Sequence, residues 1–167
     1  LPPFSSFKLD TLNCLKPQII LKPNYNVAID SVHWSLNNST FSVDSTPVTS
    51  TPGLYTLYGR GKNGCITSDT MRVLIDTVRT PMVLLSDTLT CLKKSAQIGP
   101  DPIIGGTIYR WATPWKDTLF SPALSIENGG TYYLQVTEKN GCITELKGEV
   151  VALTNPPKVN FSVDTIT

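Results

Sequence analysis

The sequence predicts an all-β protein made of two tandem β-sandwich domains. The first observation is an internal repeat, because residues 62–67 and 139–144 both read Lys-Asn-Gly-Cys-Ile-Thr, 77 positions apart. At this offset residues 9–76 and 86–153 share 18 identities without a gap, which indicates a tandem repeat. The second is the composition, in which 13 Pro and 11 Gly accompany many Ser and Thr, a mixture that favours strands and turns over helices. The third is that apolar residues alternate over short stretches and show no helical period.

Each copy of the repeat is expected to hold about seven short strands. In the first copy we predict strands at 4–9, 18–21, 29–36, 41–43, 48–50, from 53 onwards and 65–75. In the second copy we predict strands at 82–86, 96–98, 107–112, 124–126, 130–137 and 142–152. Trp34 alternates with Val32 and Leu36, so it is the expected core anchor of the first copy, and Trp111 is its counterpart in the second. Strands this short, with turn signals every 8 to 12 residues, indicate a β-sandwich of the immunoglobulin-like kind.

The strongest hairpin signal lies between the last two strands of each copy. Tyr55 and Leu57 should point to the core while Tyr58 points outward, and Asn63-Gly64 is the preferred dipeptide of a two-residue type I′ turn. Tyr55 and its counterpart Tyr132 follow a glycine at the start of the strand, a position suited to a tyrosine corner. These two tyrosines are therefore expected to be further core anchors.

The four cysteines follow the repeat. Cys14 and Cys65 are 51 positions apart, as are Cys91 and Cys142. This equality predicts one disulfide within each domain, Cys14 to Cys65 and Cys91 to Cys142. A metal site is disfavoured because the chain has one His and no Cys-x-x-Cys pair. Disulfides persist in oxidising surroundings, so we expect an extracellular or cell-surface location.

The repeat also sets the expected domain limits. We predict domains at 1–77 and 78–155, followed at 156–167 by the first strand of a third repeat. For this last segment two interpretations stay open: an excerpt from a longer array, or a strand that is donated to another copy of the chain. The junction at 77–81 contains a β-branched pair and a proline, so we expect it to be stiff and to hold successive domains end to end as a rod.

Composition excludes several functions. The net charge is +1 and only 16% of the residues are charged, which leaves no basic field for nucleic acid. No apolar run approaches the roughly 20 residues needed to span a bilayer, so membrane insertion is not expected.

His33 aligns with Arg110 and should point outward, so we predict no catalytic residue, no enzyme activity and no cofactor. Asp10, Asp87 and Asp164 recur at the unit boundaries, where they either bind calcium or cap a turn.

Exposed aromatic residues are the best indication of a binding face. Tyr58 and Tyr133 should face outward, and Trp115 aligns with Asn38, so it has no counterpart in the first copy. Such rings stack on sugars or anchor protein interfaces. For Trp115 three interpretations stay open: packing under its own loop, an interface with another chain or domain, or a glycan site.

The shared motifs resemble those of immunoglobulin-like or PKD-like tandem repeats in giant bacterial surface proteins. The matching elements are the leading D-T-L-x-C, the Trp strand, G-x-Y-x-L and the closing N-G-C-x-T. The resemblance implies a structural repeat of an extracellular adhesin or filament, exported by the type IX route and serving attachment. Its implied partners are other copies of the chain or neighbouring repeats, with a cell-surface glycan or protein as target. The alternative is a carbohydrate-binding or spacer module of a secreted enzyme.

Overall fold

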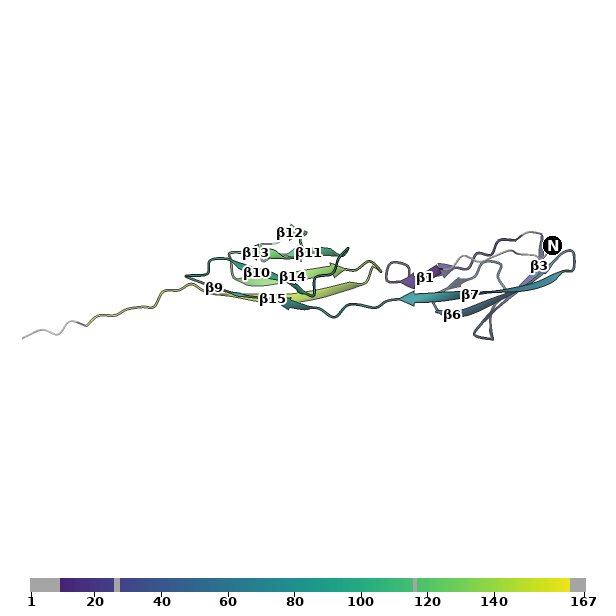
Figure 1. Cartoon of the computed structure of the whole chain (residues 1–167), viewed down its shortest axis with the longest axis horizontal. Helices are drawn as coiled ribbons and strands as arrows, with labels where there is room; N and C mark the ends of the chain where they lie inside the picture. Colours follow the sequence, from purple (N-terminus) through teal and green to yellow (C-terminus); the bar gives the residue numbers. More distant parts are fainter. Residues whose placement is uncertain (1–9, 26–27, 116, 163–167) are drawn as a thin grey trace, which may run out of the picture. The chain divides into compact units, whose positions relative to one another are not determined.

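The computed structural model of this protein describes residues 10–25, 28–115 and 117–162. Every regular element in these ranges is a β-strand (Figure 1), and none of these residues is helical. The strand predicted at 4–9 lies outside the described residues. An all-β fold is thereby confirmed for the described part of the chain.

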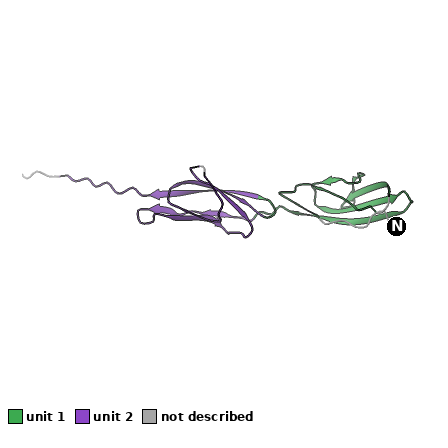
Figure 2. Ribbon diagram, turned by 90° about the horizontal axis from the view of Figure 1, so that it is seen from above, with its two compact units in different colours: residues 1–79, 139–142 green, residues 80–138, 143–167 purple. Residues whose placement is uncertain are grey.

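The chain divides into two compact units (Figure 2). Unit 1 contains residues 1–79 and 139–142, and unit 2 contains residues 80–138 and 143–167. The change from one unit to the other at 79 and 80 falls two residues after the predicted limit at 77. The short segment 139–142 clusters with unit 1 although it is part of the second sequence copy.

Unit 1 contains a five-stranded sheet and a two-stranded ribbon. The sheet has the order β1-β7-β6-β3-β4. Its strands are β1 (Asp10–Asn13), β7 (Ile66–Asp76), β6 (Gly53–Gly61), β3 (Ile29–Leu36) and β4 (Ser39–Ser42). β1 runs parallel to β7, with Asp10 opposite Val73, and the other neighbours are antiparallel. The ribbon pairs β2 (Ile19–Ile20) with β5 (Val48–Thr49).

Unit 2 contains a five-stranded and a three-stranded sheet. The larger sheet has the order β12-β11-β14-β15-β9, and the smaller one has the order β13-β10-β8. The strands of the larger sheet are β12 (Thr118–Leu119), β11 (Ile108–Ala112), β14 (Gly130–Thr137), β15 (Ile143–Leu153) and β9 (Thr88–Thr90). Those of the smaller sheet are β13 (Leu124–Ile126), β10 (Ala96–Asp101) and β8 (Val83–Leu85). β9 runs parallel to β15, as β1 does to β7.

Each unit has one apolar core between its two layers. In unit 1 Ile19 of the ribbon packs in one cluster with Trp34 and Tyr55 of the sheet. In unit 2 Ile98 of the smaller sheet packs in one cluster with Trp111 of the larger. Strands with one buried face are the signature of a sandwich, since side chains alternate between the core and the solvent. The described strands therefore support an immunoglobulin-like β-sandwich fold.

The two tryptophans are the largest side chains in these cores. Trp34 and Trp111 are both 0% exposed. Each donates its indole N–H to a backbone carbonyl, Trp34 to Asp44 at 2.9 Å and Trp111 to Ser121 at 2.8 Å. The N–H of a buried indole usually finds a hydrogen-bond partner, and here both carbonyls lie ten residues further along the chain.

The type I′ turn lies in a different place from the one predicted. Asn63 does not have a positive φ, whereas Gly64 has a φ of 80° and its N–H donates to the Gly61 carbonyl at 2.9 Å. This is a type I turn followed by a left-handed glycine, a three-residue hairpin loop with a bulge, so the predicted two-residue turn is wrong. Asn37 and Asn38, with φ of 48° and 70°, instead join β3 to β4 as a two-residue turn. Asparagine tolerates this backbone because its short side chain bonds locally.

The described part of the C-terminal segment contains no strand. Residues 154–162 are without regular structure, and the exposed side chains include Val159 and Phe161. A strand needs a neighbouring backbone to pair with, and no described strand is paired with this segment. The prediction of a strand at 156–167 is therefore not met at 156–162, and residues 163–167 lie outside the described ones.

Candidate functional site

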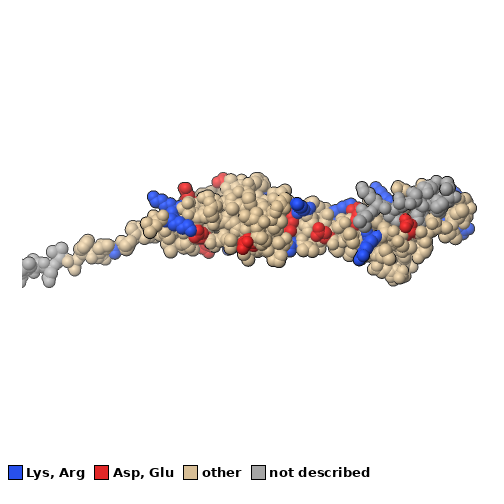
Figure 3. Space-filling view, viewed as in Figure 1, with Lys and Arg blue, Asp and Glu red and all other residues tan. Residues whose placement is uncertain are grey.

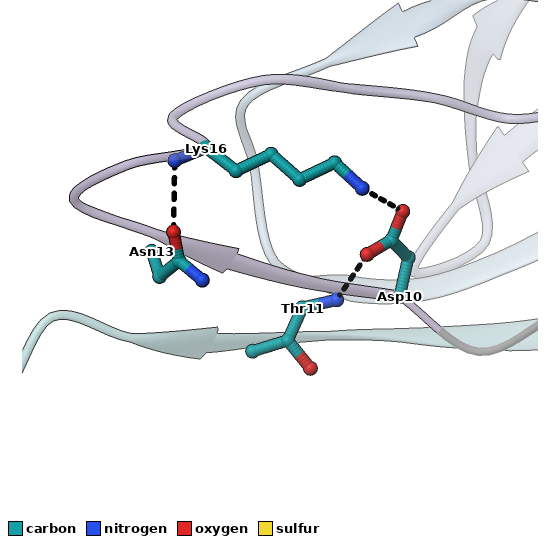
Figure 4. A network of polar contacts seen from close by, with 4 residues as sticks. All are labelled: Asp10, Thr11, Asn13 and Lys16. Carbon is teal, nitrogen blue, oxygen red and sulfur yellow. Dashed lines mark hydrogen bonds and ion pairs between the residues drawn. The ribbon is translucent and has the colours of Figure 1, made fainter. Parts of the chain in front are cut away.

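The loop that follows β1, which we call cysteine loop 1 (residues 13–16), is closed by side-chain hydrogen bonds and an ion pair. The Asn13 side-chain oxygen accepts the N–H groups of Leu15 at 3.1 Å and Lys16 at 2.8 Å. The Asp10 carboxylate accepts the Thr11 N–H at 2.8 Å and forms an ion pair with Lys16 (Figure 4). These bonds close the loop on itself, so Cys14 sits at the tip of a fixed turn.

Unit 2 carries the same arrangement, which we call cysteine loop 2 (residues 90–93). Asp87 accepts the Thr88 N–H at 2.7 Å and forms an ion pair with Lys93, and the Thr90 hydroxyl accepts the Lys93 N–H at 3.0 Å. The hydrogen bond from Lys93, followed by that from Thr88, lowers the pKa of Asp87. The recurrent Asp thus caps its turn, and Asp164 lies outside the described residues.

The structure corrects the predicted disulfides. Cys14 is bonded to Cys142, 128 positions away, whereas Cys65 and Cys91 are free and exposed. The physical reason is the parallel pairing of β1 with β7, which sets Asn13 opposite Asp76 at the end of β7. Cys65 comes just before the start of β7, whose 11 residues span about 33 Å at the usual rise per residue. Two cysteines can be bridged only when their Cα atoms are within about 7 Å, so the predicted Cys14 to Cys65 bond cannot form in this fold.

The same argument excludes the predicted bond in the second copy. Thr90 lies opposite Leu153 at the end of β15, and Cys142 comes just before the start of this strand. Cys91 and Cys142 are therefore at opposite ends of a strand of 11 residues. The equal spacing of the cysteines reflects the repeat and does not report which of them are close in space.

Cys142 belongs to a tight turn, residues 139–142, which we call cysteine turn 2. The Asn140 carbonyl accepts the Cys14 N–H at 3.1 Å. The Asn140 amide donates to the Asp76 carboxylate at 3.0 Å and to the Val78 carbonyl at 2.7 Å. Cysteine turn 2 is thus held by three hydrogen bonds beside the disulfide, all within unit 1.

A glycine makes this close approach possible. Gly141 has a φ of 78°, and a Cβ added to it would lie 2.0 Å from the Leu15 Cγ. Leu15 therefore occupies the space that any side chain at 141 would fill, and both Gly141 and Cys142 are buried. We did not predict from the sequence that Leu15 and Asn140 contact each other's segments at the disulfide. The signal that could have indicated Leu15 is an apolar residue directly after Cys in a polar loop, which occurs in both copies.

The predicted surface aromatics are exposed. Tyr58 on β6 lies with its ring 6.1 Å from that of His33, and Tyr133 on β14 lines a shallow hollow of about 300 Å³ together with Arg110, Gln135 and Glu145. Trp115, in the segment between β11 and β12, is 55% exposed. This exposure shows that the ring is at most partly packed under its own loop. An interface and a glycan site are the other two interpretations.

Other kinds of site lack support in the described ranges. Residues 10–25, 28–115 and 117–162 contain no group of three or more His, Cys, Asp or Glu side chains that could hold a metal ion. No helix long and apolar enough to cross a bilayer occurs in them. Figure 3 shows Lys and Arg interspersed with Asp and Glu on the face that it presents, so neither sign dominates there.

Comparisons with known proteins give distant structural likenesses. No family model and no curated protein matches the sequence. Among solved structures, fibronectin(III)-like modules of Clostridium thermocellum CbhA are 9% identical, with a TM-score of 0.41 and 97% of each chain covered. Murine CEACAM1b is 13% identical with a TM-score of 0.38, covering 89% of this chain and all of that one. The insect immune protein hemolin is 9% identical with a TM-score of 0.41, covering 91% of this chain and 46% of that one. Likenesses this distant carry no function, and the fold assignment rests on the strand order described above.

Proposed function

We propose that this chain is a structural repeat of a large extracellular bacterial adhesin or filament, forming a stiff rod for attachment to surfaces or other cells. The observation that carries the proposal is the disulfide between Cys14 and Cys142. It joins a loop of the first sequence copy to a turn of the second, so tension along the chain cannot part these segments without breaking a covalent bond. Such bonds persist outside the cytoplasm, where an adhesin would work.

The tandem repeat supports the same proposal. Each copy of the pattern encodes one β-sandwich, and in repeat proteins such units act in series. Partners would be further copies of the chain or neighbouring repeats, with a glycan or protein on another surface as the target and type IX secretion as the export route. We also propose that the chain has no catalytic activity and binds no cofactor.

One observation favours a second candidate, a carbohydrate-binding or spacer module of a secreted enzyme. Tyr133 stands at a shallow hollow whose other lining residues include Arg110, Gln135 and Glu145. An exposed ring beside hydrogen-bonding side chains is a common arrangement for holding a sugar. A hydrolase domain in the same polypeptide, in place of further copies of the 77-residue pattern, would favour this candidate.

Stiffness is tested on the 167-residue chain by small-angle X-ray scattering. The variant carries Gly and Ser at 77–81 together with Cys142→Ser, which removes both the proline-containing junction and the disulfide. We expect a narrow distribution of interatomic distances for the native chain and a broad one for the variant, since Gly/Ser linkers behave as flexible coils. A control with Gly and Ser at 77–81 but with Cys142 retained separates the two contributions.

Equally broad distributions for the native chain and the variant would contradict the rod. Electron microscopy of the native full-length protein then distinguishes the two candidates. Extended fibres with a regular subunit repeat support the adhesin or filament, whereas a compact catalytic body carrying a short appendage supports the enzyme module.

A further inference from the structure

The chain contains the same six-residue segment in two different states. In residues 139–144 the turn is covered, with Gly141 and Cys142 buried. In residues 62–67 the turn, which we call cysteine turn 1 (residues 62–65), is bare, and a Cβ added to Gly64 would meet nothing within 4 Å. Because the letters are identical, the difference comes from what each turn contacts.

The two turns share a left-handed glycine and one internal hydrogen bond. Gly64 and Gly141 have φ of 80° and 78°, and in each turn the cysteine N–H is donated to the Asn side-chain oxygen at 3.1 Å. Cysteine turn 1 thus already has two features that cysteine turn 2 shows when bonded, the left-handed glycine and the hydrogen bond from the cysteine N–H to the Asn side chain.

The matching loop whose cysteine is not in a disulfide is cysteine loop 2. It is closed by the same bonds as cysteine loop 1: the ion pair of Lys93 with Asp87 and the Thr90 N–H donated to the Lys93 carbonyl at 2.9 Å. Asn13 holds cysteine loop 1 in the same way, with its N–H donated to the Lys16 carbonyl at 3.0 Å. Cysteine loop 2 is therefore formed in advance of any partner.

The surroundings of Cys91 are open. A hollow of about 570 Å³ is lined by Cys91, Thr90 and Lys94 together with Asn128 and Thr154. Leu92, the counterpart of Leu15, is 99% exposed, whereas Leu15, which lies against Gly141, is 74% exposed. Docking of a second turn would therefore cover part of the Leu92 side chain, and burial of apolar surface is favourable.

We propose that Cys91 of one copy of the chain forms a disulfide with Cys65 of a second copy, cysteine loop 2 receiving cysteine turn 1 as cysteine loop 1 receives cysteine turn 2. The proposal deepens the proposed function, on which it rests for the assembly of copies in series. Leu92 would take the place of Leu15 against the glycine of the incoming turn. In the repeat alignment Asn155 corresponds to Val78, so its carbonyl would accept a hydrogen bond from the Asn63 amide as the Val78 carbonyl does from Asn140. Leu153 corresponds to Asp76, so the second bond of Asn140 would have no counterpart.

The bond forms by thiol–disulfide exchange. A Cys91 or Cys65 thiolate attacks one sulfur of a low-molecular-weight disulfide such as oxidised glutathione and expels one glutathione thiolate. The second cysteine thiolate then attacks the protein sulfur of the mixed disulfide and expels the other glutathione. Two cysteine thiols are oxidised and one glutathione disulfide is reduced to two thiols, with the protons passing to the glutathione thiolates.

The experiment uses two full-length variants, Cys65→Ser and Cys91→Ser, each of which keeps the disulfide between Cys14 and Cys142. Each variant is incubated alone, and an equimolar mixture is incubated in parallel, in a buffer of oxidised and reduced glutathione. Non-reducing gel electrophoresis measures the disulfide-linked dimer, and peptide mapping identifies the linked cysteines. We expect at least about tenfold more dimer in the mixture, the ratio that a preference of about 1.4 kcal/mol gives.

A third variant tests the docking itself. Gly64→Asn keeps a residue that tolerates positive φ, but its side chain would meet Leu92 of the partner copy, as a side chain at 141 would meet Leu15. Combined with Cys91→Ser and mixed with Cys65→Ser, it should reduce the dimer to the level of either variant alone. Retention of the native melting temperature by Gly64→Asn shows that the loss is not unfolding.

The proposal is overturned if either variant alone dimerises as well as the mixture, since random oxidation would link Cys91 to Cys91 or Cys65 to Cys65 equally well. It is also overturned if the wild-type chain bonds Cys65 to its own Cys91 and stays monomeric. Neither result touches the proposed function, because the scattering of the single chain and the microscopy of the native protein do not depend on these two cysteines.

Discussion

The two buried tyrosines near the start of the penultimate strands differ in the hydrogen bonds that their hydroxyl groups make. Tyr132 donates its hydroxyl to the Asn128 carbonyl at 2.8 Å, and Tyr55 donates to the Thr51 carbonyl at the same distance. Tyr55 has a second partner, the buried Thr49 hydroxyl at 2.6 Å. Both bonds reach back four residues, the geometry of a tyrosine corner, and burial raises the pKa of Tyr132.

We predict that Tyr55→Phe destabilises the protein more than Tyr132→Phe. Removing the Tyr132 hydroxyl loses one hydrogen bond, about 0.5 to 1.5 kcal/mol, whereas removing that of Tyr55 also leaves Thr49 without this partner in the core, about 1 to 3 kcal/mol. Urea unfolding followed by amide signals from each unit measures the two losses. Tyr133→Phe, at an exposed position, is the control and should change the free energy of unfolding by less than about 0.5 kcal/mol. Equal losses for Tyr55→Phe and Tyr132→Phe would contradict the assigned role of Thr49.

At the scale of elements, the same turn sequence serves two situations. Cysteine turns 1 and 2 both follow a penultimate strand and both contain a left-handed glycine. In one turn the glycine faces open space, and in the other it faces Leu15. Both turns therefore need a residue that tolerates a left-handed backbone, whereas only cysteine turn 2 also needs a residue without a side chain.

We predict that Gly141→Asn destabilises the chain and Gly64→Asn does not. Asparagine tolerates the left-handed backbone at both positions, so the comparison isolates the side-chain clash with Leu15, which as overpacking should cost about 1 to 3 kcal/mol. Thermal unfolding of the two variants measures the difference. The double variant Gly141→Asn with Leu15→Ala should recover part of the loss, and equal melting temperatures for the two single variants would show that Leu15 makes no steric demand.

At the scale of the whole molecule, the covalent links decide how far along the chain a constraint reaches. The bond between Cys14 and Cys142 closes a loop of 128 positions. In the chain-entropy account a loop of this length stabilises by roughly 5 kcal/mol, a large part of a domain's net stability. The predicted bonds would have closed two loops of 51 positions, each within one sequence copy.

We predict that peptide mapping without reduction recovers a Cys14 to Cys142 peptide, and that iodoacetamide labels Cys65 and Cys91 in the freshly purified monomer. Cys142→Ser should lower the free energy of unfolding, because the long loop is then open, whereas Cys65→Ser should leave it unchanged. Recovery of Cys14 linked to Cys65, or of Cys91 linked to Cys142, would restore the pairing suggested by equal spacing and overturn the structural assignment.

The sequence by itself determined most of the strands and the core positions of the two tryptophans and the two corner tyrosines, but it did not predict β1, β9 or β12. Alternation around Trp34 and Tyr55 is a local property of a pleated backbone, so it can be read without knowing what lies opposite. The turn types were harder to predict from the sequence, because the backbone of Asn63 depends on where the flanking strands stop pairing.

Only the tertiary structure decided the disulfide and the covering of one cysteine turn. A repeat makes all spacings equal, and a disulfide forms only between cysteines that the fold brings within a few ångströms of each other. The parallel pairing of the first strand with the last places Cys14 beside the end of β7, far from Cys65 and within reach of Cys142.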